Sequence, residues 1–375
     1  MHHIAFRTDA SVEIGIGHIM RCLTLADRLK QHGAQIRFVS RHLPEHLRGM
    51  LVAKGHEFAL LDSEQNDAVV GGLAHSHWPG VSQAQDSMDS IRRLSDKTWD
   101  WLVIDHYALD IEWETAMRPY SKHIMVIDDL ADRKHDCDLL LDQNYYRDLE
   151  QRYQGLLPEQ CATLLGPAYV LLRPEFAEAR QKLRVRDGTV RRILVFFGGS
   201  DPTNQTKKVV EALNFLGRPD IEVDVVVGSI NPNRNTIQAL CDELSNVTFH
   251  CQVSNMAELI LNADLGIGAG GAATWERCCL GLPTITVVFA ANQERTTEDI
   301  AEIGAIEYLG WSDQLRSEDY ARAITGMIEN PQRTRQIGEV ALGMLQGGGE
   351  SLEDVIHRII QKTRFLHSSS CAVTQ

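Results

Sequence analysis

A histidine at the end of a glycine-rich loop is well placed for acid–base chemistry. His18 follows Gly15-Ile16-Gly17, and this loop begins at Asp9, just after a strand-like run over residues 4–7. A helical pattern starts at the histidine, and the partial positive charge of a helix N-terminus disfavours the imidazolium. A neutral imidazole can act as a general base on water. The alternative is a histidine that caps the helix or hydrogen-bonds within the loop.

The same loop begins like a dinucleotide-binding fingerprint but does not complete it. Met20 and Arg21 stand where the third glycine is needed, and the second strand ends in Val39-Ser40-Arg41 without an acidic residue for a ribose. We therefore expect neither a nicotinamide nor a flavin, and no other cofactor.

Two glycine-rich segments in the second half of the chain each follow a strand-like run. One is Gly198-Gly199-Ser200, with Asn204 near the N-cap of the next predicted helix, and the other is Gly268-Ala269-Gly270-Gly271. Such turns present a nest of backbone N–H groups, which suits an anion, and glycine lets a diphosphate approach the backbone closely. Tight turns without a ligand are the alternative.

Polar side chains follow these loops at spacings that suit a nucleotide. Glu276 lies further along the helix after the second loop, where its carboxylate could accept both hydroxyls of a ribose. Asn292 and Gln293 follow the strand-like run 284–288, and the amide of Asn292 could hydrogen-bond a sugar or a phosphate. Two glycine loops, a carboxylate and an amide at successive strand ends together favour a binding site.

An acidic run between residues 126 and 142 raises the question of a metal. It holds six aspartates, of which Asp136-Cys137-Asp138 forms a D-x-D pair that could bind a divalent cation beside a diphosphate. Solvated turns and helix caps are the simpler interpretation, so we expect no metal site. Asp105, Tyr107 and the pair Asp128-Asp129 also follow strands and could face a ligand.

Strand-like and helical patterns alternate along most of the chain, which predicts βαβ units and parallel sheets. We expect strands over residues 4–7, 35–40, 57–61, 101–104, 123–127 and 139–141, and then over 192–197, 222–227, 247–250, 264–267, 284–288 and 306–309. The alternation breaks between about residues 144 and 190. The sequence therefore predicts an α/β fold of two Rossmann-like domains, with the ligand in the cleft between them at the carboxyl ends of the strands.

The expected domains are residues 1–165, with the histidine loop, and 166–349, followed by a helix and polar tail over 350–375. The segment 66–89 is rich in Gly, Ser, His and Gln and is expected to be a loop, and the tail after His367 is expected to be frayed.

The net charge of the chain indicates which classes of binding partner to expect. There are 51 acidic against 37 basic residues, a net charge of −14, which disfavours nucleic acid but not a small phosphate ligand held by backbone N–H groups. No apolar run is long enough to span a membrane, and the start lacks a signal-like apolar stretch. The eight cysteines form no C-x-x-C pair. We therefore expect a cytoplasmic protein with reduced thiols.

The motifs together resemble a known family. Arg7-Thr8-Asp9-Ala10-Ser11, followed by Gly15-Ile16-Gly17-His18-Ile19-Met20-Arg21-Cys22, is similar to the opening signature of the UDP-2,4-diacetamido-2,4,6-trideoxy-β-L-altropyranose hydrolases of pseudaminic acid synthesis. Further similar stretches are Val103-Ile104-Asp105-His106-Tyr107, Ile127-Asp128-Asp129-Leu130-Ala131-Asp132-Arg133, Leu140-Leu141-Asp142-Gln143-Asn144, Gly166-Pro167-Ala168-Tyr169-Val170-Leu171-Leu172-Arg173-Pro174-Glu175-Phe176 and Phe197-Gly198-Gly199-Ser200-Asp201-Pro202.

The resemblance implies a GT-B-like fold, kinship with the glycosyltransferase that makes lipid II, and UDP bound mainly by the C-terminal domain. It implies that His18 is the catalytic base, activating a water that attacks the anomeric carbon and displaces UDP with inversion, without a metal. The expected substrate-binding residues are Asp9, Gly15, Gly17, Arg21, Tyr107, Arg173, Gly199, Ser200, Asn204, Gly270, Gly271, Glu276, Asn292 and Gln293.

The resemblance further implies a monomer that makes at most transient contacts with neighbouring enzymes of its pathway. The nonulosonic acid made there would serve surface polysaccharide or flagellin glycosylation. One alternative is a GT-B glycosyltransferase or a UDP-sugar epimerase. A transferase with a lipid acceptor needs a basic and apolar membrane patch, for which the candidates are Arg41, Arg48 and Lys54 beside Leu47, Met50, Leu51 and Val52. A non-catalytic nucleotide-sugar binding module is the other alternative.

Overall fold

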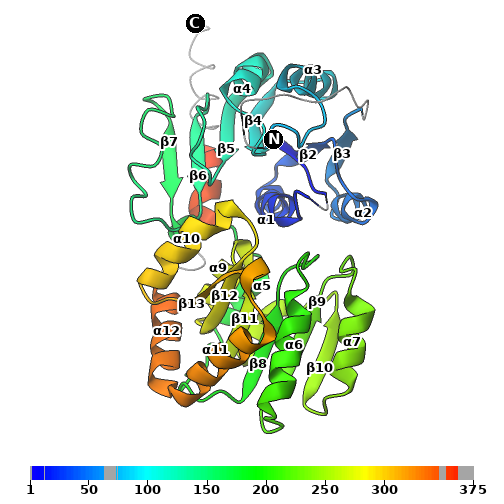
Figure 1. The fold of residues 1–375 in the computed structure, drawn as a ribbon. Helices are drawn as coiled ribbons and strands as arrows, with labels where there is room; N and C mark the ends of the chain where they lie inside the picture. The colour runs from blue at the N-terminus through cyan, green and yellow to red at the C-terminus, as the bar shows by residue number, and fades with distance from the viewer. Residues whose placement is uncertain (1, 12, 63–72, 74, 346–351, 362–375) are drawn as a thin grey trace, which may run out of the picture. The chain divides into compact units, whose positions relative to one another are not determined.

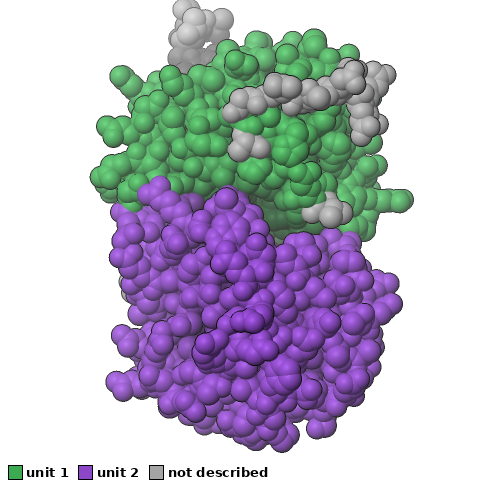
Figure 2. Space-filling model, viewed as in Figure 1, with its two compact units in different colours: residues 1–144, 148–171, 349–375 green, residues 145–147, 172–348 purple. Residues whose placement is uncertain are grey.

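A computed structural model describes residues 2–11, 13–62, 73, 75–345 and 352–361 of the chain (Figure 1). The chain divides into two compact units (Figure 2). The first contains residues 1–144, 148–171 and 349–375, and the second contains residues 145–147 and 172–348. The chain thus leaves the first unit after residue 171 and returns to it near its end.

The first unit is built on a parallel sheet of seven strands in the order β3-β2-β1-β4-β5-β6-β7. The strands are β1 (His3–Thr8), β2 (Gln35–Ser40), β3 (Glu57–Leu60), β4 (Trp99–Asp105), β5 (Ser121–Ile127), β6 (Leu139–Asp142) and β7 (Ala162–Leu165). The six strands expected in this half are confirmed. The edge strand β7 was not predicted, because it is short and lies in the stretch where the regular alternation breaks.

Helices connect these strands as a parallel sheet requires. They are α1 (Gly17–Gln31), α2 (Glu45–Ala53), α3 (Gln83–Leu94) and α4 (Ile111–Met117), with short 3₁₀ turns η1 (Arg118–Tyr120) and η2 (Pro167–Tyr169). Successive residues of the strands alternate between two separate clusters of buried side chains, such as Ile4 and Phe6 against Ala5. The sheet is therefore buried on both faces.

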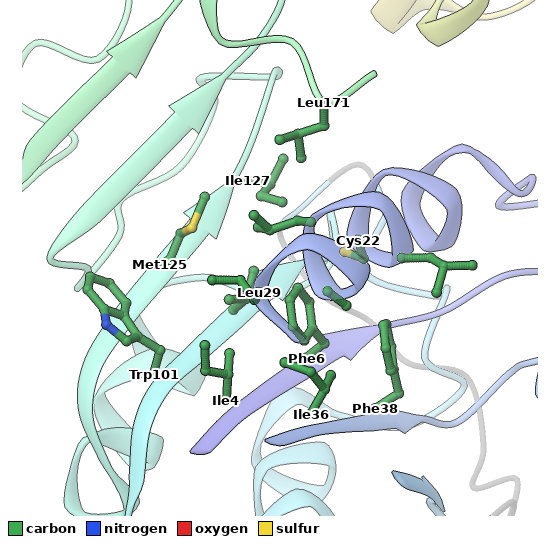
Figure 3. Close-up of a cluster of buried hydrophobic side chains, with 14 of the residues drawn as sticks. Ile4, Phe6, Cys22, Leu29, Ile36, Phe38, Trp101, Met125, Ile127 and Leu171 are labelled. Carbon is green, nitrogen blue, oxygen red and sulfur yellow. The ribbon is translucent and has the colours of Figure 1, made fainter. Parts of the chain in front are cut away.

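The larger of these clusters lies between the sheet and α1 (Figure 3). Ile4, Phe6, Ile36, Phe38 and Trp101 of the strands face Cys22 and Leu29 of α1 in this view. The helical residues 352–361 complete the cluster with Leu352, Val355, Ile356 and Ile359. Trp101 Nε1 also donates to the carbonyl oxygen of Ile359 at 3.0 Å.

The second unit has a parallel sheet of six strands in the order β10-β9-β8-β11-β12-β13. The strands are β8 (Arg192–Phe196), β9 (Glu222–Val227), β10 (Val247–Cys251), β11 (Leu265–Ala269), β12 (Thr284–Val288) and β13 (Glu307–Trp311). The helices are α5 (Pro174–Arg180), α6 (Gln205–Leu216), α7 (Arg234–Asp242), α8 (Met256–Asn262), α9 (Ala272–Cys279), α10 (Ala291–Glu302), α11 (Ser317–Glu329) and α12 (Pro331–Gly343), with the 3₁₀ turn η3 (Ser312–Gln314). All six strands expected here are confirmed, and so is the α/β class with two Rossmann-like sheets.

The expected loop over residues 66–89 is wrong in its last third. Residues 63–72 and 74 lie outside the described part of the chain, but α3 already begins at Gln83. Ser82 caps this helix, accepting from the backbone N–H of Gln85 at 3.2 Å. Asp86 and Asp89 are buried on α3 in ion pairs with Arg7 and Arg41, so these polar residues mark a buried helix face. The tail after His367 also lies outside the described residues.

The candidate membrane patch around α2 is not a continuous apolar surface. Leu47 and Leu51 are buried in the core of the first unit, whereas Val52 is 60% exposed. Arg41 is buried and pairs with Asp86 and Asp89. Among the described residues, no helix combines the length and the apolar character that crossing a membrane requires.

Candidate functional site

The order of the strands indicates a candidate ligand site in each sheet, at the carboxyl ends of its central strands. In the first sheet the chain reverses direction across the sheet between β1 and β4, and in the second between β8 and β11. The loops that follow strands at such a switch point form the usual ligand crevice of open α/β sheets. His18 follows β1, Tyr107 follows β4, and the two glycine loops follow β8 and β11.

In the first unit, His18 is positioned by a carboxylate at the end of the neighbouring strand. Thr8 and Asp105 are register partners of β1 and β4, so the histidine loop starts beside Asp105. His18 lies in the first turn of α1 and is 7% exposed. Its Nδ1 lies 2.6 Å from Oδ1 of Asp105, a carboxylate that is fully buried.

The protonation of Asp105 decides the tautomer of His18. Burial alone raises the pKa of Asp105, but the ion pair with Arg21 and the contact with His18 outweigh it and hold this pKa well below the ordinary range. An ionised carboxylate can only accept, so Nδ1 of His18 must carry the hydrogen. The neutral imidazole then has its lone pair on Nε2, to which no described residue donates a hydrogen bond.

Arg21 lies one helical turn after His18 and holds the two acidic loops in place. Its Nε and Nη2 donate to the two oxygens of Asp105 at 2.6 and 2.7 Å, and its Nη1 donates to Asp129 at 3.1 Å. Tyr107 donates its hydroxyl to the other oxygen of Asp129 at 2.5 Å. Burial and the charge of Asp129 raise the pKa of Tyr107 well above its ordinary value, so it stays a donor.

Aromatic rings surround the histidine. The ring of Tyr107 meets that of His18 edge to face at 4.6 Å between centroids, and Trp78 does so at 6.1 Å. His75 packs against Trp78 at 4.4 Å and against Tyr107 at 5.4 Å. Trp78 and His75 come from the connection between β3 and α3, and with Tyr107 they place aromatic rings around His18.

Asp9 was expected to contact the substrate but is fully buried in this structure. Its Oδ1 accepts from Arg7 Nη1 and from the backbone N–H of Arg41, each at 2.7 Å, and Nε2 of His106 lies 3.2 Å from its Oδ2. These contacts fix the loop that precedes Tyr107. Gly15 and Gly17, by contrast, have open space where a side chain would stand.

In the second unit, the loop after β8 is shaped by an aspartate. Asp201 is 1% exposed and accepts from the backbone N–H groups of Gln205 and Thr206, both at 2.8 Å. Asn204 stands at the N-cap position of α6, but its side chain forms no capping hydrogen bond. Asp201 thus occupies donors of α6 that the sequence assigned to an anion, which leaves the turn at Gly199 and Ser200 for a ligand.

The loop after β11 has little room for side chains. A Cβ on Gly270 would lie 2.9 Å from Oγ1 of Thr297, and Gly271 has a φ of +98°, a conformation that side chains rarely adopt. A Cβ on Gly271 would lie 3.6 Å from Nε2 of Gln293. Gln293 itself accepts from the backbone N–H of Phe289 at 3.1 Å, which holds its side chain within the loop after β12.

Glu276 and Arg173 form a pair in the second unit. Nη2 of Arg173 donates to Oε1 of Glu276 at 3.0 Å, and Nη1 lies 2.9 Å from Glu175. The side chain of Glu276 is 18% exposed. Burial raises the pKa of Glu276, and Arg173 opposes this shift. Asn292 is half-buried in the first turn of α10.

The D-x-D pair has a different partner in this structure. Asp136 accepts from Arg118 Nε at 3.0 Å and Asp138 from Arg118 Nη1 at 2.5 Å, so both carboxylates share one guanidinium as their partner. In the described part of the chain no group of three or more His, Cys, Asp or Glu side chains is arranged to hold a metal ion.

The structure brings six of the expected residues together in two groups, and Arg173 and Glu276 form a separate pair. His18, Arg21 and Tyr107 are in contact in the first unit, and Gly270, Gly271 and Gln293 adjoin in the second. Three residues beside them were not among the expected site residues. These are Asp105, whose place at a strand end was a usable signal, and Trp78 and His75, for which the sequence offered none.

Residues 193–341 match the glycosyltransferase family 28 C-terminal domain. The chain is 26% identical over 309 residues to the UDP-2,4-diacetamido-2,4,6-trideoxy-beta-L-altropyranose hydrolase of Campylobacter jejuni, which covers 81% of this chain and 98% of that protein. It is 25% identical over 303 residues to the uncharacterized protein MJ1062 of Methanocaldococcus jannaschii, covering 79% of this chain but only 57% of that protein.

The fold also matches a solved structure. MurG of Acinetobacter baumannii superimposes with a TM-score of 0.65 over 96% of this chain and 99% of that chain, at 15% sequence identity. The sequence similarity and the two parallel sheets agree with each other. The chain is a relative of the UDP-2,4-diacetamido-2,4,6-trideoxy-beta-L-altropyranose hydrolase and has the fold of the GT-B glycosyltransferases.

Proposed function

We propose that this protein hydrolyses a UDP-linked 2,4-diacetamido-2,4,6-trideoxy sugar at the anomeric carbon and releases UDP and the free sugar with inversion. The proposal assigns the nucleotide to the second unit and the water-activating base to the first. Its support is the relationship to the hydrolase of Campylobacter jejuni together with the chemistry of the residues around His18.

The single observation that carries the proposal is the contact between Nδ1 of His18 and the ionised Asp105 at 2.6 Å. It fixes the tautomer in which Nε2 can take a proton from water. As the water oxygen bonds to the anomeric carbon, the bond from this carbon to the phosphate oxygen breaks and its electrons leave with UDP. The charge of Asp105 stabilises the imidazolium that forms, and attack from the face opposite the leaving group inverts the configuration.

The leaving group needs stabilisation that the second unit can supply. A diphosphate that departs gains negative charge, and preorganised backbone N–H groups stabilise such charge without reorganisation. We assign this role to the turns at Gly199–Ser200 and Gly270–Gly271, and we assign the ribose to Glu276. Asn204, Asn292, Gln293 and Arg173 are proposed as further contacts of the nucleotide sugar.

The resemblance extends the proposal to the setting of the enzyme. We expect a cytoplasmic monomer that needs no metal and whose product enters pseudaminic acid synthesis for surface glycans. A transferase with a lipid acceptor receives no support from α2, because Leu47 and Leu51 are buried and Arg41 is held in ion pairs.

The test is to incubate the protein with the UDP-sugar in water, with no acceptor, and to follow UDP release by NMR. Wild-type protein is expected to release UDP, and His18→Ala to be slower by roughly 10²–10⁴-fold. The variant His46→Ala, which changes a histidine on α2 outside the proposed site, serves as the control and should keep full activity. Absence of turnover without an acceptor contradicts hydrolysis, and full activity of His18→Ala contradicts the role of that residue.

A further inference from the structure

Arg277, a buried arginine beside the Gly270–Gly271 loop, forms no ion pair with a described carboxylate. Arg277 is on α9 and is 4% exposed. Its Nη2 donates to the carbonyl oxygen of Ala269 at 2.7 Å and to Oγ1 of Thr274 at 3.3 Å, while its Nε has no hydrogen-bond partner. Among the described residues no carboxylate lies within ion-pair distance of it.

Two glycines of β11 face the side of the sheet on which Arg277 lies. Leu265, Ile267 and Ala269 of β11 belong to the core cluster on one face, so Gly266 and Gly268 face the other way. A Cβ on Gly268 would lie 2.4 Å from the carbonyl oxygen of Phe196 and 3.0 Å from Nη1 of Arg277, and one on Gly266 would lie 2.9 Å from side-chain atoms of Leu282 and Thr284. Neither glycine has a positive φ, so close packing against the neighbouring strands and against Arg277 together requires glycine here.

Burying this charge is unfavourable in the protein alone. Burial lowers the pKa of Arg277 to about 10, which still leaves it charged at neutral pH. Arg277 contacts Ala269 and Thr274, close to the N-terminus of α9, where the partial positive charge of the helix repels a cation. A buried cation is normally paired with an anion, because an unpaired one is costly to remove from water.

Arg186, which lies between α5 and β8 in the chain, contacts the opposite end of α9. It donates to the carbonyl oxygens of Leu280 at 2.6 Å and Ile260 at 2.8 Å, at the C-terminal ends of α9 and α8. The partial negative charge of these helix ends stabilises its guanidinium. Burial lowers the pKa of both arginines to about 10, but Arg186 contacts the negative ends of two helices, whereas Arg277 lies near the positive end of one.

We propose that Arg277 is a positioning residue for the diphosphate of the bound nucleotide, holding the Gly270–Gly271 loop through Ala269 and supplying from beneath it the positive charge that this anion neutralises. The inference rests on the proposed function, since it takes UDP as the ligand of this loop. It explains why a charged side chain is kept where a neutral donor would satisfy the carbonyl of Ala269.

The experiment compares the affinities for UDP and for uridine, measured by isothermal titration calorimetry. Arg277→Met keeps the unbranched stem of the side chain but removes the guanidinium and its charge, and it should weaken UDP binding by roughly 10–100-fold, as expected for a charge a few ångströms from a diphosphate. Uridine binding should change by less than about twofold, because uridine has no phosphate. Arg277→Lys should retain most of the UDP affinity, and Arg186→Met, the matched control, should retain all of it.

Different results would overturn the proposed nucleotide site and the proposed role of Arg277. If wild-type protein binds neither UDP nor pyrophosphate, the nucleotide assignment is wrong and this inference falls with it. If wild type binds UDP and Arg277→Met binds it equally well, only this inference is overturned. An equal loss of UDP and uridine affinity would show a purely structural role and would also overturn it. Should Arg277→Met fail to fold, Arg277→Lys decides, since loss of UDP affinity with the charge retained contradicts the proposal.

Discussion

At the residue scale, the chemistry depends on which nitrogen of His18 carries the hydrogen. The contact between Nδ1 and Asp105 at 2.6 Å decides this, because Arg21 keeps that carboxylate ionised. A carboxylate in this position orients the ring, selects the tautomer and stabilises the imidazolium formed during proton transfer. In the proposed reaction, His18 therefore acts as a base only in combination with Asp105 and Arg21.

Replacing Asp105 with asparagine tests this combination. An amide can donate to Nδ1, which would move the hydrogen of the neutral ring to Nε2 and remove the base. We expect kcat of Asp105→Asn to fall by roughly 10²–10⁴-fold with little change in KM. Steady-state kinetics measure this, alongside thermal unfolding, because Arg21 loses an ionised partner.

The control for this change is Asp96→Asn. Asp96 pairs with Arg37 at 2.7 Å, and its own side chain is 49% exposed. Its loss should affect neither kcat nor KM. An Asp105→Asn enzyme with unchanged kcat would show that the tautomer of His18 does not matter for the reaction.

The sequence predicted part of this site and not the rest, for a physical reason. His18 could be found because the glycine loop and the helix start are local features. Its pairing with Asp105 depends on the neighbouring positions of β1 and β4 in the sheet, which join residues 87 positions apart. Trp78 lies in a stretch without periodicity, so no pattern indicated that its ring packs against His18.

At the element scale, the loops after the strands hold the candidate residues, and backbone conformation limits what can replace them. Gly271 is the N-cap of α9 with a φ of +98° and a ψ of −155°. This region of backbone conformation is nearly restricted to glycine. The loop after β8 was predicted as an open nest, but Asp201 occupies two of its donors, a detail that only side-chain contacts reveal.

Gly271→Ala tests the second loop. Alanine should strain the backbone by about 1–3 kcal/mol and displace the N–H groups of the loop, so we expect weaker UDP binding in calorimetric titrations. Gly217→Ala is the control, since Gly217 also has a positive φ, of +57°, but ends α6 away from the glycine loops. It should lower stability alone. Equal UDP affinity in both variants would exclude this loop from the nucleotide site.

A buried histidine gives the first unit a pH-dependent stability. Nδ1 of His135 lies 2.7 Å from Oε1 of Glu114, and Nε2 lies 3.8 Å from Asp128. Burial opposes its charge, but these two carboxylates prevail and raise the pKa of His135 to about 9. Because this pKa is above its unfolded value, the stabilisation is fully present below about pH 6.5 and is lost as the pH rises through about 9.

To test this, the free energy of unfolding in urea is compared between wild type and His135→Gln over a range of pH. The difference in free energy of unfolding should be largest near pH 6 and should fall by about 3 kcal/mol by about pH 10. His46→Gln, at an exposed histidine of α2, is the control and should change the free energy of unfolding little. A difference that grows with pH would mean that His135 is buried in its neutral form.

At the scale of the whole molecule, the chain completes its first unit with its last described helical residues. The α/β class, the two sheets and twelve of the thirteen strands follow from periodicity in the sequence. The return of residues 352–361 to the first core does not, because an amphipathic pattern shows that a helix has an apolar face but not which surface covers it. Val355 and Ile356 are 0% and 1% exposed in that core.

Ile356→Ala should therefore destabilise the first unit. Truncating a buried isoleucine costs about 2–5 kcal/mol, so the urea midpoint of the first unit should fall while UDP binding by the second unit persists. His357→Ala, at the exposed neighbouring position, is the control and should leave the midpoint unchanged. Loss of UDP affinity in Ile356→Ala, at a temperature where the variant is still folded, would show that destabilising the first unit also affects the second.

The central claim is that water, activated by His18, attacks the anomeric carbon of a UDP-linked sugar. Its most direct test is to run the reaction without an acceptor in ¹⁸O-labelled water and to locate the label by mass spectrometry after a single turnover. We expect ¹⁸O at the anomeric hydroxyl of the released sugar and unlabelled UDP. Label in the phosphate of UDP, or no UDP release at all, would contradict it.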